Sequence, residues 1–434
     1  MVRIELHTEV EEVIPAEDVP GFRVKKIDLG GIRLETPVRT IYTGTDMPAR
    51  IRREVLALKD KKRTLLEVNR TIYRDRSYKS LTEALEWGGE DVKKHLRVSD
   101  NLSTENLAIV LSFSRFPTMA LGGNFEELLD HIHAYSRVVF VPHVRFNRVT
   151  SKTSLQYSSS DFIRYVEESL GILADRNSKP IFVPLDINFN KETRNEVILH
   201  YARNGYTNMW IDFKGQAITP SQIAKLRGIL RVIERAFGSR SSEVVIYIAN
   251  AKKVPRGLTM DIRLAPSDAL GPFVYGDIVG APWKGIVGFS QEDSEGYWEK
   301  KGFSSEEEYN LALFKRDASV LDIGTYYYWH PDVVRISDSS LERLREDMLS
   351  LGPSNRDKAE KVSNAINGTI HLRELGVIKK HVESEGMIAS YLSEKEFFKE
   401  TDEGKGLLQK IISTPKQGTS ERKIRNLFDF MKKL

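Results

Sequence analysis

The chain carries polar residues that each close a short apolar run, and their types suit acid–base and covalent chemistry. Asp186, Asp212 and Asp277 are the carboxylates of this set. One carboxylate can attack an electrophilic carbon while another transfers a proton, and burial can separate their pKa values. Strand-end aspartates are also ordinary helix caps and ion-pair partners, so each of them has a structural alternative. Their convergence is the functional signal.

Short apolar runs alternate with amphipathic helical segments from Leu107 onward. The runs are LAIVLSF (107–113), RVVFVPHV (137–144), PIFVPLDI (180–187), NMWIDF (208–213), EVVIYIA (243–249) and PFVYGDIVG (272–280). With TLLEV (64–68) they make about seven or eight strand–helix units, which predicts parallel strands joined by helices. We therefore expect an α/β fold: a (β/α)8 TIM-type barrel over 1–324 that is entered by a small N-terminal β-hairpin, followed over 325–434 by a helical extension with a basic C-terminal tail. The polar residues above would meet at its carboxyl strand ends.

Composition limits the class of protein further. The 434 residues include no cysteine, which excludes disulfides, thiolate metal ligands and a cysteine nucleophile. No long apolar run and no signal sequence are present, so a cytoplasmic protein without a membrane span is expected. A net charge of +4 permits nucleic-acid binding. The 29% of charged residues would suit a thermophile.

Cofactor and metal motifs are missing from the sequence. No strand run is followed by Gly-x-Gly-x-x-Gly or by a Gly-Lys-Ser/Thr loop, so no nucleotide cofactor is expected. His131 and His133 are two residues apart, which does not suit a metal site on a helix, and His143 has no partner at ligand spacing. We expect no metal and no cofactor.

A resemblance to a known family begins at FRVKKIDLGGIRLETPVRTIYTGTDM (22–47). This stretch resembles the start of the tRNA-guanine transglycosylases, whose barrel follows a small β-hairpin. TLLEVNRTIYRD, AIVLSFSRFPTMALGG, the strand–helix–strand unit from Pro180 to Gly215, and GPFVYGDIVGAPWKG are similar to later family segments in the same order. The likeness covers most of the chain in spacing and very little in motif. It implies base exchange at guanine, with one Asp attacking the ribose and a second handling protons.

The departures from the family pattern concern its reactive groups. Gly280 stands where the family has its nucleophile, and Ser112 replaces the second Asp. Asp277, Asp186 and Asp212 are therefore the candidates to take over catalysis. The resemblance places a base pocket at four residues, namely Ser112, Phe116, His143 and Phe213. The family's zinc cysteines are absent near TYYYWHPDVV, where packing of Tyr326 to Trp329 is expected to clamp the barrel to the extension.

Basic residues near strand ends suggest contact with a nucleic acid. PHVRFNR places Arg145 and Arg148 on either side of an aromatic ring, an arrangement suited to phosphate contact and base stacking. Lys214 and Lys252 follow two other strands. The expected partners are tRNA or DNA and a guanine or 7-deazaguanine base, and the family resemblance implies a homo- or heterodimer.

Three hypotheses remain open from the sequence. The first is a divergent base-exchange transglycosylase acting on tRNA or DNA. The second is a transglycosylase-like subunit without catalysis that binds a partner enzyme or nucleic acid. The third is an unrelated barrel enzyme of small-molecule metabolism, which a phosphate-binding site in the late strand loops would favour.

Overall fold

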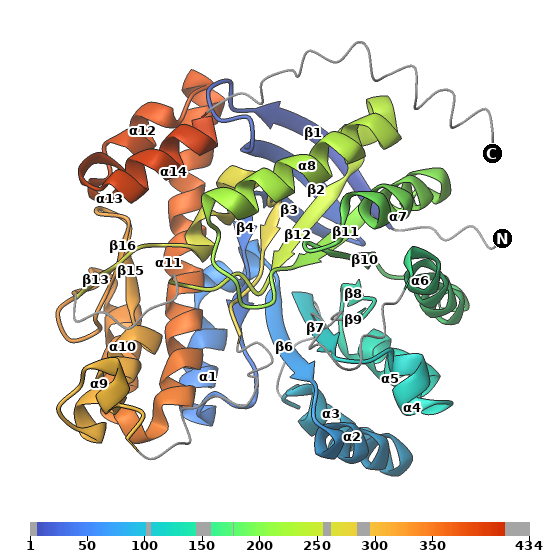
Figure 1. Ribbon diagram of the computed structural model, residues 1–434, viewed down its shortest axis with the longest axis horizontal. Helices are drawn as coiled ribbons and strands as arrows, with labels where there is room; N and C mark the ends of the chain where they lie inside the picture. The colour runs from blue at the N-terminus through green and yellow to red at the C-terminus, as the bar shows by residue number, and fades with distance from the viewer. Residues whose placement is uncertain are drawn as a thin grey trace.

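The computed structural model describes residues 7–100, 106–144, 158–176, 178–254, 262–283 and 296–412. It is an α/β protein built on a curled parallel sheet (Figure 1). One sheet has six strands in the order β4-β14-β12-β11-β10-β8, and another has four in the order β5-β6-β7-β9. The strands are β4 (Val38–Arg39), β5 (Ile41–Tyr42), β6 (Leu66–Ile72), β7 (Leu107–Phe113), β8 (Val139–Phe140), β9 (His143–Val144), β10 (Ile181–Asp186), β11 (Asn208–Asp212), β12 (Val245–Ala249) and β14 (Ile278–Val279).

All neighbouring strands in these two sheets pair in parallel. Parallel strands need crossover connections, and helices supply them. The helices between the strands are α1 (Ala49–Ala57), α2 (Asp75–Trp87), α3 (Gly89–Leu96), α4 (Pro117–Leu121), α5 (Asn124–Tyr135), α6 (Ser159–Ala174), α7 (Lys191–Asn204) and α8 (Pro220–Phe237). Side-chain caps begin several of them, as at Ser158, Asn190 and Thr219. This part of the fold agrees with the alternation of strands and helices read from the sequence.

The two parallel sheets are joined through shared chain segments. Only Thr40 separates β4 from β5, and its amide donates to the carbonyl of Val279 in the six-stranded sheet. Only Val141 and Pro142 separate β8 from β9. Each of these two segments therefore contributes hydrogen bonds to both sheets.

The N-terminal residues form a three-stranded antiparallel sheet in place of the expected small hairpin. Its strands are β1 (Thr8–Pro15), β2 (Arg23–Leu29) and β3 (Ile32–Thr36) in that order. Asn208 Nδ2, at the start of β11, donates to Thr8 Oγ1 at 2.6 Å, and Lys25 Nζ donates to the carbonyl of Val244 just before β12. The small sheet therefore contacts the amino ends of the parallel strands.

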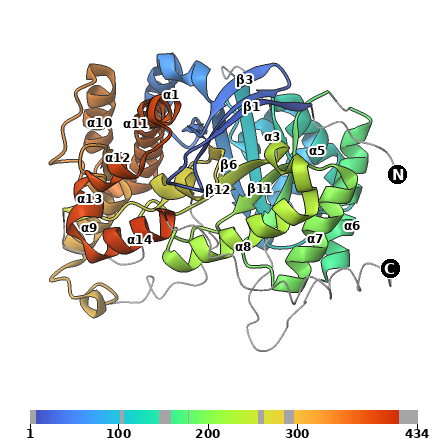
Figure 2. The same cartoon turned by 90° about the horizontal axis from the view of Figure 1, so that it is seen from above.

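The C-terminal helices gather on one side of the sheets, α2 to α7 lie on the other, and α8 lies between the two groups (Figures 1 and 2). They are α9 (Glu306–Asp317), α10 (Ser339–Leu351), α11 (Arg356–Glu385), α12 (Ala389–Ser393), α13 (Glu396–Glu400) and α14 (Asp402–Ile412). The long α11 packs directly on β4 and β5, where a Cβ added at Gly368 would come within 2.7 Å of the Thr40 carbonyl oxygen. Gly368 is therefore needed for this close approach.

A second small sheet, β13 (Arg263–Leu264), β15 (Val320–Asp322) and β16 (Tyr327–Trp329), carries the aromatic segment near residue 325. The expected boundary at 324–325 falls in the turn between β15 and β16. The ring of Tyr326 lies 6.4 Å from that of Phe273 and 5.6 Å from that of Phe398 on α13. These contacts agree with the expectation that the aromatic segment clamps the C-terminal helices to the rest of the fold. Within the described ranges, no helix offers the stretch of apolar residues that a bilayer crossing requires.

Candidate functional site

Polar side chains from consecutive strands share the concave face of the curled sheet near its carboxyl ends. Thr71 on β6 pairs with Ser112 on β7, and Ser112 pairs with His143 on β9. Asp186, the last residue of β10, pairs with Asp212, the last residue of β11. Residues in register on parallel strands point to the same face. These two sets of pairings contribute one polar side chain from each of five strands. We call the five residues the polar ring: Thr71, Ser112, His143, Asp186 and Asp212.

Asp186 is the charged centre of one half of the polar ring. Its Oδ2 lies 2.5 Å from Lys214 Nζ and 3.9 Å from His143 Nε2, and its Oδ1 accepts a hydrogen bond from the amide of Asn188 at 2.8 Å. The Asp186 side chain is 1% exposed and that of Lys214 is 14% exposed. A buried carboxylate needs a counter-charge and hydrogen bonds, and this one has both. The partly exposed Lys214 side chain lies between Asp186 and the solvent.

Asp212 is fixed in part by a residue of the other parallel sheet. Ser112 Oγ donates to its Oδ2 at 2.8 Å, and the amide of Lys214 donates to its Oδ1 at 2.6 Å. Ser112 lies in the four-stranded sheet and Asp212 in the six-stranded sheet, so this bond spans the space between the sheets. The site therefore contains two fully buried carboxylates on adjacent strands, and each is fixed by different donors.

The backbone is strained where β11 and β12 end. Lys214 has φ of 56° and Asn250 has φ of 54°, a conformation that non-glycine residues seldom adopt. Asn250 is buried, its Oδ1 accepts from the amide of Trp283 at 3.0 Å, and its Nδ2 has no hydrogen-bond partner in the described part of the chain. Strained residues of this kind concentrate at functional sites. Asn250 thus brings an unused donor to the same end of the sheet as Asp212.

Aromatic rings pack beneath the polar ring. Phe140 stacks on Phe182 at 4.9 Å between ring centres and meets Tyr247 edge-on at 4.8 Å. Trp210 Nε1 donates to the carbonyl of Val141 at 3.0 Å, and its ring lies 5.5 Å from that of His143. All of these residues are buried. The polar ring therefore lies against a layer of buried aromatic side chains. Because these side chains exclude water, charge interactions within the polar ring are stronger than they would be in water.

Glu67, which was not among the residues predicted from the sequence, is a buried carboxylate near these aromatic rings. Its Oε2 accepts from Tyr247 Oη at 2.5 Å, from Thr40 Oγ1 at 2.6 Å and from the amide of Ala281 at 2.8 Å, while Asn69 Nδ2 donates to its Oε1 at 2.6 Å. Burial, together with the charge of Glu67, raises the pKa of Tyr247 well above its usual value. The sequence signal was a lone glutamate inside the apolar run TLLEV.

Gly280, the residue that the predicted resemblance places at the family's nucleophile position, lies against this cluster. A Cβ at this position would come within 2.7 Å of Tyr247 Oη and 2.9 Å of Glu67 Oε2. Real Cβ atoms almost never approach other atoms under 3.0 Å. The space that an aspartate would need at position 280 is therefore filled by the hydrogen-bonded Glu67 and Tyr247 side chains.

The placement expected for Asp277 is wrong. Asp277 precedes β14 and lies at the amino end of that strand, away from Asp186 and Asp212 at the carboxyl ends. Its Oδ2 lies 3.0 Å from Lys25 Nζ and accepts from the amide of Ile246 at 2.8 Å. Residues 272–274, the start of the expected strand 272–280, instead belong to a 3-10 helix, Asp268–Val274. Asp277 and Lys25 form a buried ion pair that links the N-terminal sheet to the parallel sheet.

The other predicted site residues are dispersed. Phe116 packs on Tyr165 of α6 at 5.3 Å between ring centres, on the helix-covered side of the sheet. Phe213 is buried next to Asp212, and its amide donates to the carbonyl of Ala249. Lys252 follows β12 and is half-buried. Arg145 and Arg148 lie outside the described residues. Of the expected base pocket, the structure brings Ser112 and His143 together with Asp186 and Asp212.

No group of three or more His, Asp or Glu side chains arranged to hold a metal ion occurs in the described ranges. The polar ring offers two carboxylates and one imidazole, and Lys214, outside the ring, already occupies the position next to Asp186. This arrangement suits hydrogen-bond donors on a ligand, such as ring N–H and amino groups, because ionised carboxylates only accept.

Comparisons with known proteins give a distant likeness in fold. No protein-family model matches the sequence, and no curated protein does. Two similar solved structures are of the carboxyl transferase domain from Rhizobium etli pyruvate carboxylase, one with pyruvate and one with 3-bromopyruvate. They have 9% and 10% identity and TM-scores of 0.31 and 0.32, and the alignments cover 86% of this chain. This chain spans 60% and 59% of those chains. So distant a likeness carries no argument about activity, and the transglycosylase resemblance stays a prediction.

Proposed function

We propose that the two parallel sheets are halves of one closed (β/α)8 barrel. The support is that β4 and β5 are one strand interrupted at Thr40, and that β8 and β9 are one strand interrupted at Val141 and Pro142. Joining each pair gives eight strands in which every strand has two parallel neighbours. In barrels of this kind the active site lies at the carboxyl strand ends, where the polar ring is found.

The function proposed for this site is base exchange at guanine or a 7-deazaguanine in a nucleic acid, tRNA or DNA. The observation that carries the proposal is the in-register pair of buried carboxylates, Asp186 and Asp212, at adjacent strand ends. One carboxylate of such a pair can attack the ribose while its neighbour transfers the proton of the leaving base. The protein's resemblance to the transglycosylases gives the reaction type, and the substrate polymer and the cytoplasmic setting are part of the same proposal.

In the proposed exchange the two carboxylates have separate tasks. Asp186 attacks the anomeric carbon of the ribose, and a glycosyl ester forms as the carbon–nitrogen bond to the base breaks. Asp212 gives a proton to the leaving nitrogen and takes one from the incoming base, so the proton count is restored over the cycle. Lys214 neutralises Asp186 before the substrate enters, and Asn250 Nδ2 donates to the carbonyl oxygen of the base.

Incorporation of labelled guanine into bulk tRNA and into duplex DNA tests this proposal. Asp186→Asn and Asp212→Asn should each lower incorporation by roughly 100-fold or more, the usual worth of a catalytic acid or base. The matched control is Asp130→Asn, because Asp130 pairs with Arg176 on the helical surface and should leave incorporation unchanged. A denaturation-resistant adduct between protein and polymer should form with Asp212→Asn and not with Asp186→Asn. Full incorporation by both site variants would refute the assignment.

A second function is favoured by the filled space at Gly280. Because Glu67 and Tyr247 occupy the nucleophile position of the family, the chain would suit a subunit that has lost catalysis and keeps the barrel to bind a partner enzyme or a nucleic acid. Under this alternative, wild-type protein binds one of the two polymers but incorporates no base into either. The same assay therefore separates the two functions before any variant is made.

A further inference from the structure

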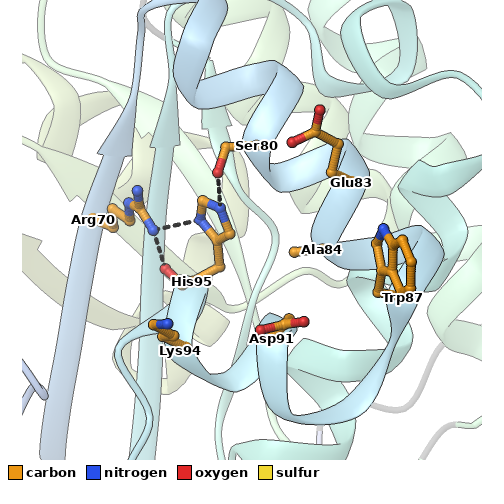
Figure 3. Close-up of a pocket in the computed structure, with 8 residues that line it drawn as sticks. All are labelled: Arg70, Ser80, Glu83, Ala84, Trp87, Asp91, Lys94 and His95. Atoms are coloured by element: carbon orange, nitrogen blue, oxygen red, sulfur yellow. Dashed lines mark hydrogen bonds between the residues drawn. The ribbon is translucent and has the colours of Figure 1, made fainter.

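A pocket of about 490 Å³ lies on the outer side of the parallel sheet, away from the polar ring. It lies between α2, α3 and the outer face of β6 (Figure 3). Its lining residues are Arg70, Ser80, Glu83, Ala84, Trp87, Asp91, Lys94 and His95. This volume is within the usual range for sites that bind small molecules.

The inner wall of the pocket carries a positive charge that no carboxylate in the described part of the chain pairs with. Arg70 Nη1 donates to His95 Nδ1 at 2.6 Å and also to the carbonyl of His95, and both acceptors are neutral. Among the described residues Arg70 makes no ion pair, since the nearby Asp46 is paired with Arg97 at 3.0 Å. Burial and the charge of Arg97 lower the pKa of Arg70 to about 10, which still leaves it charged at neutral pH. An anionic group on a ligand would supply the missing counter-charge.

The hydrogen bonds of His95 set the chemistry of Ser80. Because Arg70 can only donate, His95 Nδ1 must accept, so the ring proton is on Nε2 and points to Ser80 Oγ at 2.8 Å. Burial and the charge of Arg70 lower the pKa of His95, which keeps the ring neutral. This tautomer prevents His95 from taking the Ser80 proton, so the pair is not a nucleophilic dyad. It leaves the Ser80 hydroxyl hydrogen free to donate into the pocket.

The outer rim has the opposite character. Trp87, the last residue of α2, is 83% exposed, and Figure 3 shows it across the pocket from Arg70. Glu83 and Asp91 place exposed carboxylates beside it, and Lys94 is the one basic residue of this rim. A large exposed aromatic ring next to a pocket suits stacking on a flat ligand. The carboxylates would accept hydrogen bonds from N–H groups on the edge of that ligand.

We propose that this pocket binds a guanine nucleotide. The phosphate contacts Arg70 and the Ser80 hydroxyl, the base stacks on Trp87, and its ring N–H and amino group donate to Glu83 or Asp91. Adenine lacks the paired donors of guanine, so the two rim carboxylates select guanine. The site is separate from the polar ring, and the inference does not depend on base exchange there. The nucleotide is either a free mononucleotide or a guanine in a single strand, because the recognised groups are the same.

Calorimetric titration of the full-length protein tests the inference with guanosine 5′-monophosphate, adenosine 5′-monophosphate, inorganic phosphate and a thymine strand containing one guanine. We expect the guanine nucleotide to bind at least about 10-fold more tightly than the adenine nucleotide, because adenine offers the rim carboxylates no paired ring N–H and amino donors. Trp87→Ala should weaken binding by about 5- to 100-fold, the range for loss of one base–aromatic stack, and Trp87→Phe should retain most of it. Tighter binding of the strand than of the mononucleotide would assign the site to nucleic acid.

Three outcomes would overturn the inference. They are equal affinity for the guanine nucleotide and for phosphate alone, unchanged affinity in Trp87→Ala, and no binding of either guanine ligand. Glu83→Gln and Asp91→Asn together should abolish the preference for guanine while phosphate contact remains. Because Trp87 is mostly exposed and both carboxylates lie at the rim, these variants should fold as the wild type does, which thermal unfolding checks.

Discussion

The buried ion pair of Lys25 and Asp277 gives the sharpest prediction, because it decides whether Asp277 is structural. Both side chains are inaccessible, at 0% and 3% exposure, and Lys25 Nζ also donates to the carbonyl of Val244 at 2.5 Å. Burial lowers the pKa of Lys25 from 10.5 to about 8, against the opposing charge of Asp277. Asp277→Ala removes that opposing charge and also the acceptor for the amide of Ile246.

The cost of Asp277→Ala follows from these contacts. Without its partner Lys25 loses its proton, and at pH 7, one unit below its pKa, this costs at most about 1.4 kcal/mol. The unpaired Ile246 amide adds about 1–3 kcal/mol. We therefore expect a loss of about 2.5–4.5 kcal/mol at pH 7. Near pH 9 Lys25 is already neutral in the wild type, so the first contribution disappears and the loss falls by about 1.4 kcal/mol.

Urea denaturation at the two pH values measures this difference. Glu12→Gln is the matched control on the same small sheet, since Glu12 pairs with Lys26 at 2.6 Å in an exposed position and should not change the unfolding midpoint. Two results would refute the reasoning. One is an unchanged midpoint for Asp277→Ala, and the other is a loss that does not shrink from pH 7 to pH 9. Loss of base exchange in Asp277→Asn with full stability would return Asp277 to the list of catalytic residues.

Three further predictions concern the interior. Gly280→Ala should destabilise the protein by about 1–3 kcal/mol, because its Cβ would meet Tyr247 Oη at 2.7 Å, and an unchanged urea midpoint would show that the cluster can move aside. At Asn250, with φ of 54°, alanine should be less stable than glycine by about 1 kcal/mol, and equal midpoints for the two variants would contradict the strain. Burial lowers the pKa of His371 from 6.5 to about 3, so the unfolded chain takes up a proton that the folded chain refuses, and stability falls as pH drops through this window. His371→Gln should flatten the acid side of a pH–stability curve, and an unaltered slope would count against this origin.

The sequence predicted the strands well where polar or turn-forming residues flank an apolar run on both sides. The run 107–113 is strand β7, and the runs 180–187 and 208–213 contain strands β10 and β11, which end at Asp186 and Asp212. The same pattern failed at 272–280, because Pro272 and the glycines around it favour a 3-10 turn, and only Ile278 and Val279 join the sheet. That error placed Asp277 at the wrong end of its strand. An apolar run identifies buried chain, but its strand end depends on which residues form the ladder.

Pairings within the site could not be predicted from the sequence. Ser112 and Asp212 are 100 residues apart, and Glu67 and Tyr247 are 180 apart. Such contacts depend on the register between strands, which local patterns do not determine. A resemblance in order and spacing likewise said nothing of what fills the space beside Gly280. The residue types at the strand ends were therefore predictable, while their partners, and the structural role of Asp277, required the three-dimensional arrangement.

Buried carboxylates alone do not mark a functional site in this fold. The groups that neutralise or hydrogen-bond each carboxylate distinguish the structural ones from the candidate reactive one. Glu67 accepts four hydrogen bonds within the protein, and Asp277 has a lysine that is itself sealed from solvent. Asp186 differs, because its counter-charge, Lys214, is 14% exposed and can withdraw toward water without breaking the sheet. Withdrawal of the Lys214 side chain would leave one Asp186 oxygen free to contact a ligand, with Asp212 beside it in register.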